Sequence, residues 1–183
     1  PPALLFASTA QAGSPRCSGA YVEQKMEAER TLLHAAEQGV VHGAVLRLST
    51  VFGRSPTSGS PGRGVVLAMA RRALAGLPIT MWHDGSVRRD LLDVRDAAAA
   101  FRVAWEHAPA LSGQCWAVGT GTSQPMGEVF RILADVVAEH TGREPVAIET
   151  VAPPEHAAAA DFESLTVDPA PFRGVTGWRA RAG

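Results

Sequence analysis

Short apolar runs alternate with longer amphipathic segments along the chain. Residues 3–7 form a continuous apolar run between polar residues, a pattern typical of a buried strand. Residues 126–137 instead repeat large apolar side chains at helical spacing, which predicts an amphipathic helix over 125–140. On the same grounds we predict strands over 3–7, 42–51, 79–82, 91–94, 114–118 and 146–151, and helices over 20–38, 65–75, 96–108 and 125–140. This alternation predicts an α/β domain with a mainly parallel sheet.

Glycine, proline and serine mark the segments between these elements. Residues 53–64 are rich in all three and are predicted to form a loop. Gly39 and Gly76 close two of the helices, and Asp96 is placed to cap the helix over 96–108. The chain has no initiator methionine, and its first strand leads directly into a polar loop, so we expect that preceding sequence is missing.

The composition narrows the class of protein. The 183 residues are 46% hydrophobic and 19% charged, which is typical of a soluble globular domain. A net charge of -1 without a basic run offers no general surface for nucleic acid, and no apolar stretch is long enough to span a membrane. Cys17 and Cys115 are far apart and are expected to be reduced thiols in a cytoplasmic protein. The histidines lack metal-ligand spacing, so we expect no metal site.

Tyr21 and Lys25 form a Y-x-x-x-K motif in the first predicted helix. A spacing of four residues puts both side chains on one helix face. A tyrosine hydroxyl has an ordinary pKa of about 10, too high for easy proton exchange at neutral pH. An ammonium about 4 Å away favours the phenolate by roughly 4 kcal/mol at an effective dielectric of about 20. The motif therefore predicts a tyrosine tuned toward the range where general acid–base catalysis works best.

Taken alone, the motif could also be a Tyr–Lys pair on the protein surface. The residues around it favour a catalytic pair. Tyr21 is the only tyrosine in the sequence. It lies thirteen residues after Ser8, and the strand that precedes its helix ends in Ser8-Thr9. Loops at the carboxyl ends of parallel strands are where ligands bind in such sheets. Either Ser8 or Thr9 can therefore supply a hydroxyl that holds a substrate oxygen.

Six segments follow one another in a recognisable order. They are F-A-S-T-A at 6–10, A-Y-V-E-Q-K-M-E-A-E-R at 20–30, L-R-L-S-T-V-F-G at 46–53, I-T-M-W-H-D-G-S-V-R-R-D-L-L-D-V-R-D at 79–96, W-A-V-G-T-G at 116–121 and T-G-W at 176–178. Together they resemble the extended short-chain dehydrogenase/reductase family, also described as NAD-dependent epimerases and dehydratases. The sequence around Trp82 and P-P-E-H at 153–156 is most similar to nucleotide-hexose 4-ketoreductases of deoxysugar biosynthesis.

The resemblance implies a fold and a division of the chain. The expected fold is the C-terminal portion of a Rossmann-like, doubly wound, mainly parallel sheet with a smaller substrate-binding region. Residues 1–54 are expected to be the remainder of the dinucleotide-binding domain with the catalytic segment. Residues 55–183 are expected to form mainly the nucleotide-sugar-binding region, with some elements returning to the sheet.

The resemblance also assigns roles to the catalytic segment. Tyr21 would donate a proton to the sugar carbonyl oxygen, and Lys25 would lower the pKa of Tyr21 and hold the nicotinamide ribose. Thr9 would donate a hydrogen bond to the same carbonyl oxygen. Ser8 is the alternative to Thr9, because the alignment with the family motif can shift by one residue. The resemblance also implies that Ser8, Tyr21 and Lys25 bind the cofactor.

Three further residues are expected at the sugar nucleotide. Thr50 falls where many relatives carry an asparagine that contacts the ligand. Arg89 falls at the position that binds the diphosphate, for which a planar guanidinium is suited. Trp82 falls where relatives often place an aromatic residue near the nucleobase.

The implied activity is reduction of the 4-keto group of a nucleoside-diphosphate-linked, preferably dTDP-linked, keto-deoxyhexose by NADP or NAD. A 4-epimerase is the alternative enzyme, and a fragment or binding module without the cofactor site is the alternative of another class. A 4,6-dehydratase is disfavoured, because Ala10 and Gln11 stand where those relatives carry an acidic pair. The expected partner is the sugar nucleotide, and the full-length protein is expected to be a homodimer.

The sequence departs from the family pattern in two features, and some residues are expected to have structural roles only. The loop between Thr9 and Tyr21 is about a dozen residues shorter than the family's usual loop, and no glycine-rich dinucleotide motif is present. The remaining expectations are structural: Trp105 and Trp116 in the core, Asp90 in a structural role, Arg88 on a solvated face, and Glu23, Glu27 and Glu29 on the polar side of their helix.

Overall fold

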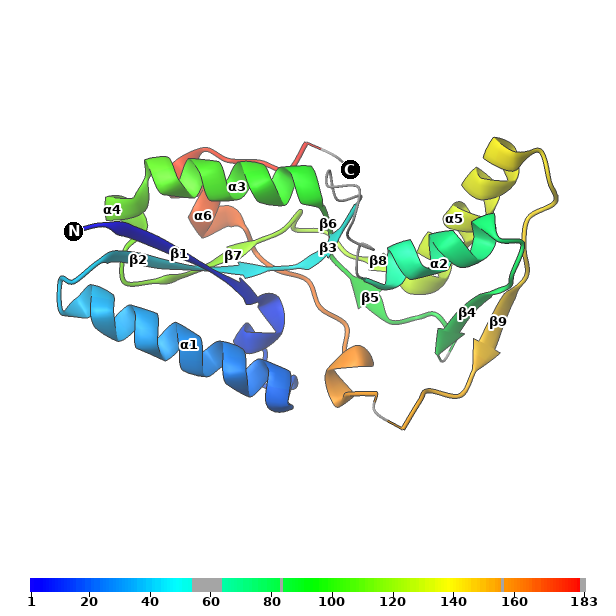
Figure 1. The fold of residues 1–183 in the computed structure, drawn as a ribbon, viewed down its shortest axis with the longest axis horizontal. Coiled ribbons are helices and arrows are strands. Elements are labelled where there is room, and N and C mark those ends of the chain that lie inside the picture. Colours follow the sequence, from blue (N-terminus) through cyan, green and yellow to red (C-terminus); the bar gives the residue numbers. More distant parts are fainter. Residues whose placement is uncertain (54–63, 83, 156, 182–183) are drawn as a thin grey trace.

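The structure is a computed structural model that describes residues 1–53, 64–82, 84–155 and 157–181. These residues form two lobes, with a sheet and its covering helices in one and two packed helices with two short strands in the other (Figure 1). The predicted loop over 53–64 lies almost entirely outside the described residues.

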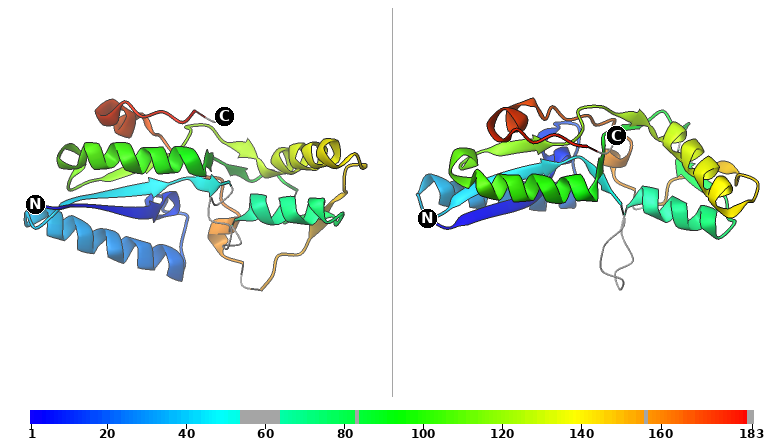
Figure 2. Two further views of the ribbon diagram at one scale, coloured as in Figure 1. Left: turned by 45° about the horizontal axis from the view of Figure 1, so that its top comes forward. Right: turned by 90° about the horizontal axis from the view of Figure 1, so that it is seen from above.

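The first lobe is built on a parallel sheet in the order β1-β2-β7. Strand β1 (Ala3–Thr9) pairs along its whole length with β2 (His42–Leu48), and β2 pairs with β7 (Cys115–Val118). Helix α1 (Ala20–Glu37) covers one face of the sheet and α3 (Val94–Glu106) covers the other (Figures 1 and 2). The α/β class with a mainly parallel sheet is thereby confirmed.

Close packing of α1 on the sheet depends on a glycine in β2. A Cβ atom added at Gly43 would lie 2.8 Å from Leu32 Cδ1 and 3.2 Å from Ala36 Cβ. Both neighbours belong to α1, so any larger residue would push the helix away from the strand. This close approach lets α1 pack directly on β2.

The second lobe packs a helix pair against a two-stranded sheet. Helices α2 (Val65–Leu74) and α5 (Met126–Thr141) lie side by side in every view, and β4 (Ile79–Trp82) pairs in parallel with β9 (Ile148–Val151) (Figures 1 and 2). The predicted apolar face of α5 is confirmed. Its buried side chains are Met126, Phe130, Ala134 and Val137.

Short strands join the two lobes. β3 (Thr50–Phe52) pairs in parallel with β6 (Leu91–Asp93), and β5 (Arg88–Arg89) pairs antiparallel with β8 (Gln124–Pro125). The strand predicted over 42–51 is therefore two strands, because the chain changes its hydrogen-bond partner at Ser49. Ser49 N donates to Val118 O on one side of the break. The remaining described elements are η1 (Ala10–Gly13), α4 (Ala108–Leu111), η2 (Ala159–Asp161) and α6 (Ala170–Thr176).

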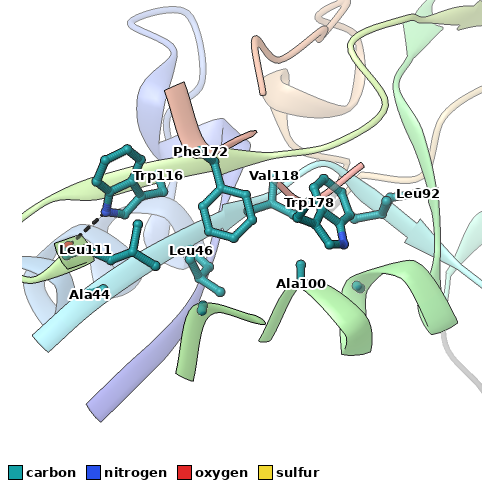
Figure 3. Packing of buried hydrophobic residues seen from close by; sticks show 11 residues of the cluster. Ala44, Leu46, Leu92, Ala100, Leu111, Trp116, Val118, Phe172 and Trp178 are labelled. Carbon is teal, nitrogen blue, oxygen red and sulfur yellow. Dashed lines mark hydrogen bonds between the residues drawn. The ribbon is translucent and has the colours of Figure 1, made fainter. Parts of the chain in front are cut away.

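The core of the first lobe is centred on Phe172, which is fully buried. Its ring lies between those of Trp116 and Trp178, with centroid distances of 6.4 Å and 5.7 Å (Figure 3). The indole of Trp116 donates a hydrogen bond of 2.9 Å to Leu111 O. The prediction that Trp116 belongs to the core is confirmed, whereas α6, which carries Phe172, is not predicted by the sequence pattern.

Two sequence-based expectations about α3 are wrong. The helix begins at Val94 and its cap is Asp93, whose carboxylate accepts a hydrogen bond of 2.7 Å from Arg95 N. Asp96 accepts a hydrogen bond of 3.0 Å from Arg181 N instead. Trp105 is 60% exposed, because alanines form the face of α3 that meets the sheet.

Asp90 has the structural role that was predicted. It is buried, and its carboxylate accepts hydrogen bonds of 2.9 Å and 2.8 Å from the main-chain nitrogen and the hydroxyl of Thr120. A further bond of 3.1 Å comes from Gly121 N. These contacts tie the strands that join the lobes to the chain that leaves β7. Arg88 is exposed, as predicted, and its guanidinium donates to Ser123.

Candidate active site

Tyr21 and Lys25 lie in the first two turns of α1, beside the end of β1. Lys25 Nζ donates a hydrogen bond of 2.8 Å to Ala7 O and lies 5.8 Å from the centre of the Tyr21 ring. The same ammonium lies 4.9 Å from the centre of the Phe6 ring. The lysine is thus held by β1 and placed next to the tyrosine. Tyr21 itself is 56% exposed, so its ring is open to a ligand.

The two candidate hydroxyls at the end of β1 have different surroundings. Ser8 is buried, and its Oγ donates a hydrogen bond of 2.5 Å to Glu29 Oε1. Thr9 is the last residue of β1, is only partly buried, and its Oγ1 accepts a hydrogen bond of 3.3 Å from Gln11 N. A serine hydroxyl has a single donor, and in Ser8 that donor is used inside the fold.

Glu29 is the centre of a buried polar network, which corrects the expectation that it lies on the polar side of its helix. Arg47 Nε donates to Glu29 Oε1 at 2.9 Å, and Arg47 Nη2 donates to Glu29 Oε2 at 2.5 Å. Burial alone raises the pKa of Glu29, but the hydrogen bonds from Arg47 and Ser8 outweigh it and hold this pKa below its usual value. Charged pairs of this bidentate kind are among the stronger hydrogen bonds in proteins.

The position of Glu29 carries a signal that sequence reasoning missed. Val22, Glu29 and Leu32 are the buried residues of α1, and a spacing of seven and then three residues places them on one helical stripe. A carboxylate on a stripe of this kind must be paired inside the fold, and Arg47 lies on the strand that α1 covers.

The lowered pKa of Glu29 predicts how stability depends on pH. A group whose folded pKa is depressed stabilises the fold above its unfolded value, here 4.5, and that contribution disappears as pH falls through the folded pKa. Wild type should therefore resist urea more than Glu29→Gln at neutral pH, and this difference should shrink as the pH is lowered from 4.5 through the depressed folded pKa. Urea unfolding of both chains at a series of pH values measures this. A difference that stays constant with pH would contradict the prediction.

The three residues predicted to contact a sugar nucleotide line one cavity. Thr50, Trp82 and Arg89 come from β3, β4 and β5, and they meet around a space of about 440 Å³ where the two lobes join. Gln11, whose main-chain nitrogen donates to Thr9, lies in the same wall. The cavity is otherwise mainly apolar, with side chains of Val65, Met69, Met81, Val87, Met126 and Phe130. Apolar walls with a few polar groups are typical of small-molecule sites.

An aromatic pair closes one side of this cavity. The rings of Trp82 and Phe162 have a centroid distance of 6.1 Å and an interplanar angle of 46°. Phe162 follows η2, and it was not singled out from the sequence, because nothing local in its segment relates it to a strand eighty residues earlier.

Arg89 is held at the cavity wall by main-chain oxygens. Its Nη2 donates to Ala160 O at 3.1 Å and to Asp161 O at 2.7 Å, and its Nη1 donates to Glu163 O and, at 3.2 Å, to Arg88 O. Burial lowers the pKa of Arg89, and the nearby acidic side chains oppose this shift. The guanidinium therefore ties residues 160–163 to β5, next to Phe162.

Other features of the described residues lie apart from this site. A larger cavity, of about 910 Å³, lies between α3 and residues 176–181, and none of the predicted site residues lines it. Within the described ranges no group of three or more His, Cys, Asp or Glu side chains is placed to hold a metal ion. No helix in this part of the chain has the length and apolar character needed to cross a membrane.

The sequence profile of the NAD dependent epimerase/dehydratase family matches residues 3–119. The chain belongs to this family. The predicted family is thereby confirmed, and the matched residues include the Tyr21–Lys25 pair, the end of β1 and the strands that carry Thr50, Trp82 and Arg89. No curated protein matches the chain in sequence.

Solved structures of epimerases and dehydratases share this fold. An epimerase from Methanothermobacter thermautotrophicus is 15% identical with a TM-score of 0.82, and the match covers 98% of this chain and 55% of that one. The UDP-glucose 4-epimerase of Thermus thermophilus, solved with NAD, is 26% identical with a TM-score of 0.72 and coverages of 98% and 59%. The dTDP-glucose 4,6-dehydratase of Bacillus anthracis, also solved with NAD, is 18% identical with a TM-score of 0.76 and coverages of 98% and 57%.

These matches confirm the predicted Rossmann-like fold of this family member. The chain spans between 55% and 59% of the length of the three solved relatives.

Proposed function

We propose that the protein reduces the 4-keto group of a nucleoside-diphosphate-linked 4-keto-deoxyhexose, with dTDP as the preferred nucleotide. The observation that carries this proposal is that Gln11 connects two sets of residues. Lys25 is fixed next to Tyr21 at the end of β1, and Gln11 links Thr9 to the cavity lined by Thr50, Trp82 and Arg89.

In this proposal each residue of the catalytic segment has one task. Tyr21 donates a proton to the sugar carbonyl oxygen, and the hydroxyl of Thr9 holds that oxygen by a hydrogen bond. Thr9 is preferred to Ser8, because the Ser8 donor is committed to Glu29. The nicotinamide, as NADPH or NADH, supplies the hydride.

The surroundings of Lys25 fit a nicotinamide ribose. An ammonium has three N–H donors, and among the described residues one of them is used, by Ala7 O. The other two can bind ribose hydroxyls on the open side of α1, where Tyr21 is exposed.

The cavity is assigned to the sugar nucleotide. Trp82 offers an aromatic ring for stacking of the base, and Arg89, which lines the same cavity, offers a guanidinium for the diphosphate. Because the Nη groups of Arg89 bind main-chain oxygens in this structure, a bound diphosphate has to share or displace them. Thr50 adds a hydroxyl where many relatives carry an asparagine.

A 4-epimerase is the second candidate, because it uses the same tyrosine and lysine. It is supported by the likeness to the UDP-glucose 4-epimerase of Thermus thermophilus. A 4,6-dehydratase is less well supported, because Ala10 is a buried alanine and Gln11 carries an amide, so neither supplies the carboxyl group that elimination requires. The homodimer, the cytoplasmic location and the division of the chain at residue 54 stay predictions.

A turnover assay tests the reaction. The whole protein is incubated with a dTDP-4-keto-6-deoxyhexose and either NADPH or NADH. We expect nicotinamide absorbance to fall only when the keto sugar is present, in proportion to the product formed. Interconversion of UDP-glucose and UDP-galactose without a change in nicotinamide absorbance would favour the epimerase.

Arg89→Ala tests the diphosphate assignment. We expect KM for the sugar nucleotide to rise by roughly 10- to 150-fold, the equivalent of about 1.5 to 3 kcal/mol for a hydrogen bond to a charged group. Arg89→Lys should restore only part of the affinity, because a point charge replaces a planar fork. Steady-state kinetics of both variants measures this.

Arg88→Ala is the matched control for this prediction. Arg88 is the neighbouring residue of β5 and is exposed, and its guanidinium binds Ser123 away from the cavity. Its loss should leave KM unchanged. An unchanged KM in Arg89→Ala would show that Arg89 serves only to hold residues 160–163.

A further inference from the structure

One buried carboxylate joins the helix that carries Tyr21 to all three strands of the sheet. Glu29 accepts hydrogen bonds from Ser8 on β1 and from Arg47 on β2, and Cys115 Sγ on β7 lies 3.8 Å from Glu29 Oε2. The side chain of Glu29 is 4% exposed and that of Arg47 is 26% exposed. A charge at this depth is retained only when its hydrogen bonds are well made.

The contacts on β1 come immediately before the residue assigned to the substrate oxygen. Lys25 binds Ala7 O and Glu29 binds Ser8 Oγ, so α1 holds two successive residues that lead into Thr9. Ser8 and Arg47 are also direct partners in the register of β1 and β2. The network therefore fixes both the distance between β1 and α1 and the position of β1 along the helix axis.

The spacing along α1 transmits this constraint to the catalytic pair. Glu29 lies four residues after Lys25 and eight after Tyr21, so the three side chains lie on one side of the helix. A helix is stiff over two turns, and anchoring it at Glu29 limits both its rotation and its sliding over the sheet. Lys25 and Tyr21 are then aimed at the end of β1.

We propose that Glu29, paired with Arg47, is a positioning residue that sets Tyr21 and Lys25 against Thr9. The proposal rests on the function proposed above. Glu29 does not line the cavity that holds Thr50, Trp82 and Arg89, so its loss should alter the chemical step and spare substrate binding. A misplacement of about 1 Å at reacting groups can cost about 100-fold in rate.

Glu29→Ala in the whole protein is the primary test, and Glu29→Gln is the conservative variant. We expect kcat of Glu29→Ala to fall by roughly 10- to 100-fold with KM within about threefold of wild type. Glu29→Gln keeps the length and one acceptor oxygen, and it should recover part of the lost kcat. Normal kcat in Glu29→Ala would overturn the proposal.

Two control variants separate positioning from stability. Glu27 lies on the same helix, is exposed and pairs with Arg30, so Glu27→Ala should leave kcat unchanged. Leu32→Ala loosens the apolar packing of α1 on Gly43 without touching the polar network. At a temperature where circular dichroism shows both folded, Leu32→Ala should keep most of its kcat and Glu29→Ala should not. Equal losses in the two variants would overturn the proposal.

A spectroscopic test does not depend on activity and so separates this proposal from the proposed function. With isotope-labelled tyrosine in the whole protein, the ring signals that are absent from Tyr21→Phe are those of Tyr21. These signals should shift in Glu29→Ala and stay in place in Glu27→Ala. If the whole protein turns over no nucleotide sugar but this shift occurs, the proposed function fails and the positioning role stands. If the ring signals of Glu29→Ala match those of wild type, the positioning role fails.

Discussion

Tyr21→Phe in the whole protein is expected to lower kcat for ketone reduction by at least about 100-fold, the lower end of the range for a lost general acid. Hydride addition to a ketone leaves an alkoxide unless a proton arrives with it. The substitution keeps the ring and deletes only the hydroxyl, at a position that is 56% exposed, so the fold should be intact by circular dichroism. In a plot of kcat against pH, the change in rate that depends on the proton donor should be absent from Tyr21→Phe.

Lys25→Met should be similarly damaging, because it removes the charge beside Tyr21 and, in the proposed function, a contact to the nicotinamide ribose. It also breaks the bond to Ala7 O. Near-normal turnover of a nucleotide-linked keto sugar by Tyr21→Phe would show that the catalytic assignment is wrong. The chain would then be better described as a binding module of this family.

Phe172→Ala is expected to lower the free energy of unfolding by about 3 to 5 kcal/mol, the range for a fully buried phenylalanine. Its ring packs between Trp116 and Trp178, and its removal leaves a cavity between α6 and the sheet (Figure 3). Urea unfolding of the 183-residue chain measures this. Val175→Ala on the same helix is the control, because Val175 is 38% exposed and should cost far less. Equal losses in the two variants would contradict the packing described for this core.

The pattern of apolar residues predicted the elements that have strong periodicity or uniform burial. β4 has the predicted bounds, α1 ends one residue before its predicted end, and α5 begins and ends one residue later than predicted. α6 was missed, because Pro171 and Gly174 make its sequence a poor helix former. It forms because Phe172 is buried against the sheet, a tertiary contact that no local pattern reports.

The orientation of single side chains was harder to predict than the elements that carry them. On α3 the buried stripe consists of small residues, Ala97, Ala100 and Ala104, which let the helix approach the sheet closely. Trp105 follows that stripe and points outward despite its size. A large apolar side chain is therefore a weaker guide to burial here than the spacing of alanines.

For the candidate site, the motifs singled out residues whose roles stay predictions, and they gave no information on what surrounds those residues. Thr50, Trp82 and Arg89 were assigned through their motifs, and they do line one cavity. Phe162 and the Arg89 contacts to residues 160–163 depend on segments about seventy to eighty residues apart, which only the folded chain brings together. The partners of Glu29, Arg47 and Ser8, are also distant in sequence, so only the helical stripe that Glu29 shares with Val22 and Leu32 could have indicated its burial.

Transfer of deuterium from the nicotinamide to the sugar tests the central claim most directly. The whole protein is given a dTDP-4-keto-6-deoxyhexose with NADPH or NADH that carries deuterium at the transferred position, and the product is analysed by mass spectrometry and nuclear magnetic resonance. We predict one deuterium at C4 of the sugar for each nicotinamide oxidised, and loss of this transfer in Tyr21→Phe. Product without deuterium at C4, or no conversion of any nucleotide-linked keto sugar, would contradict the account.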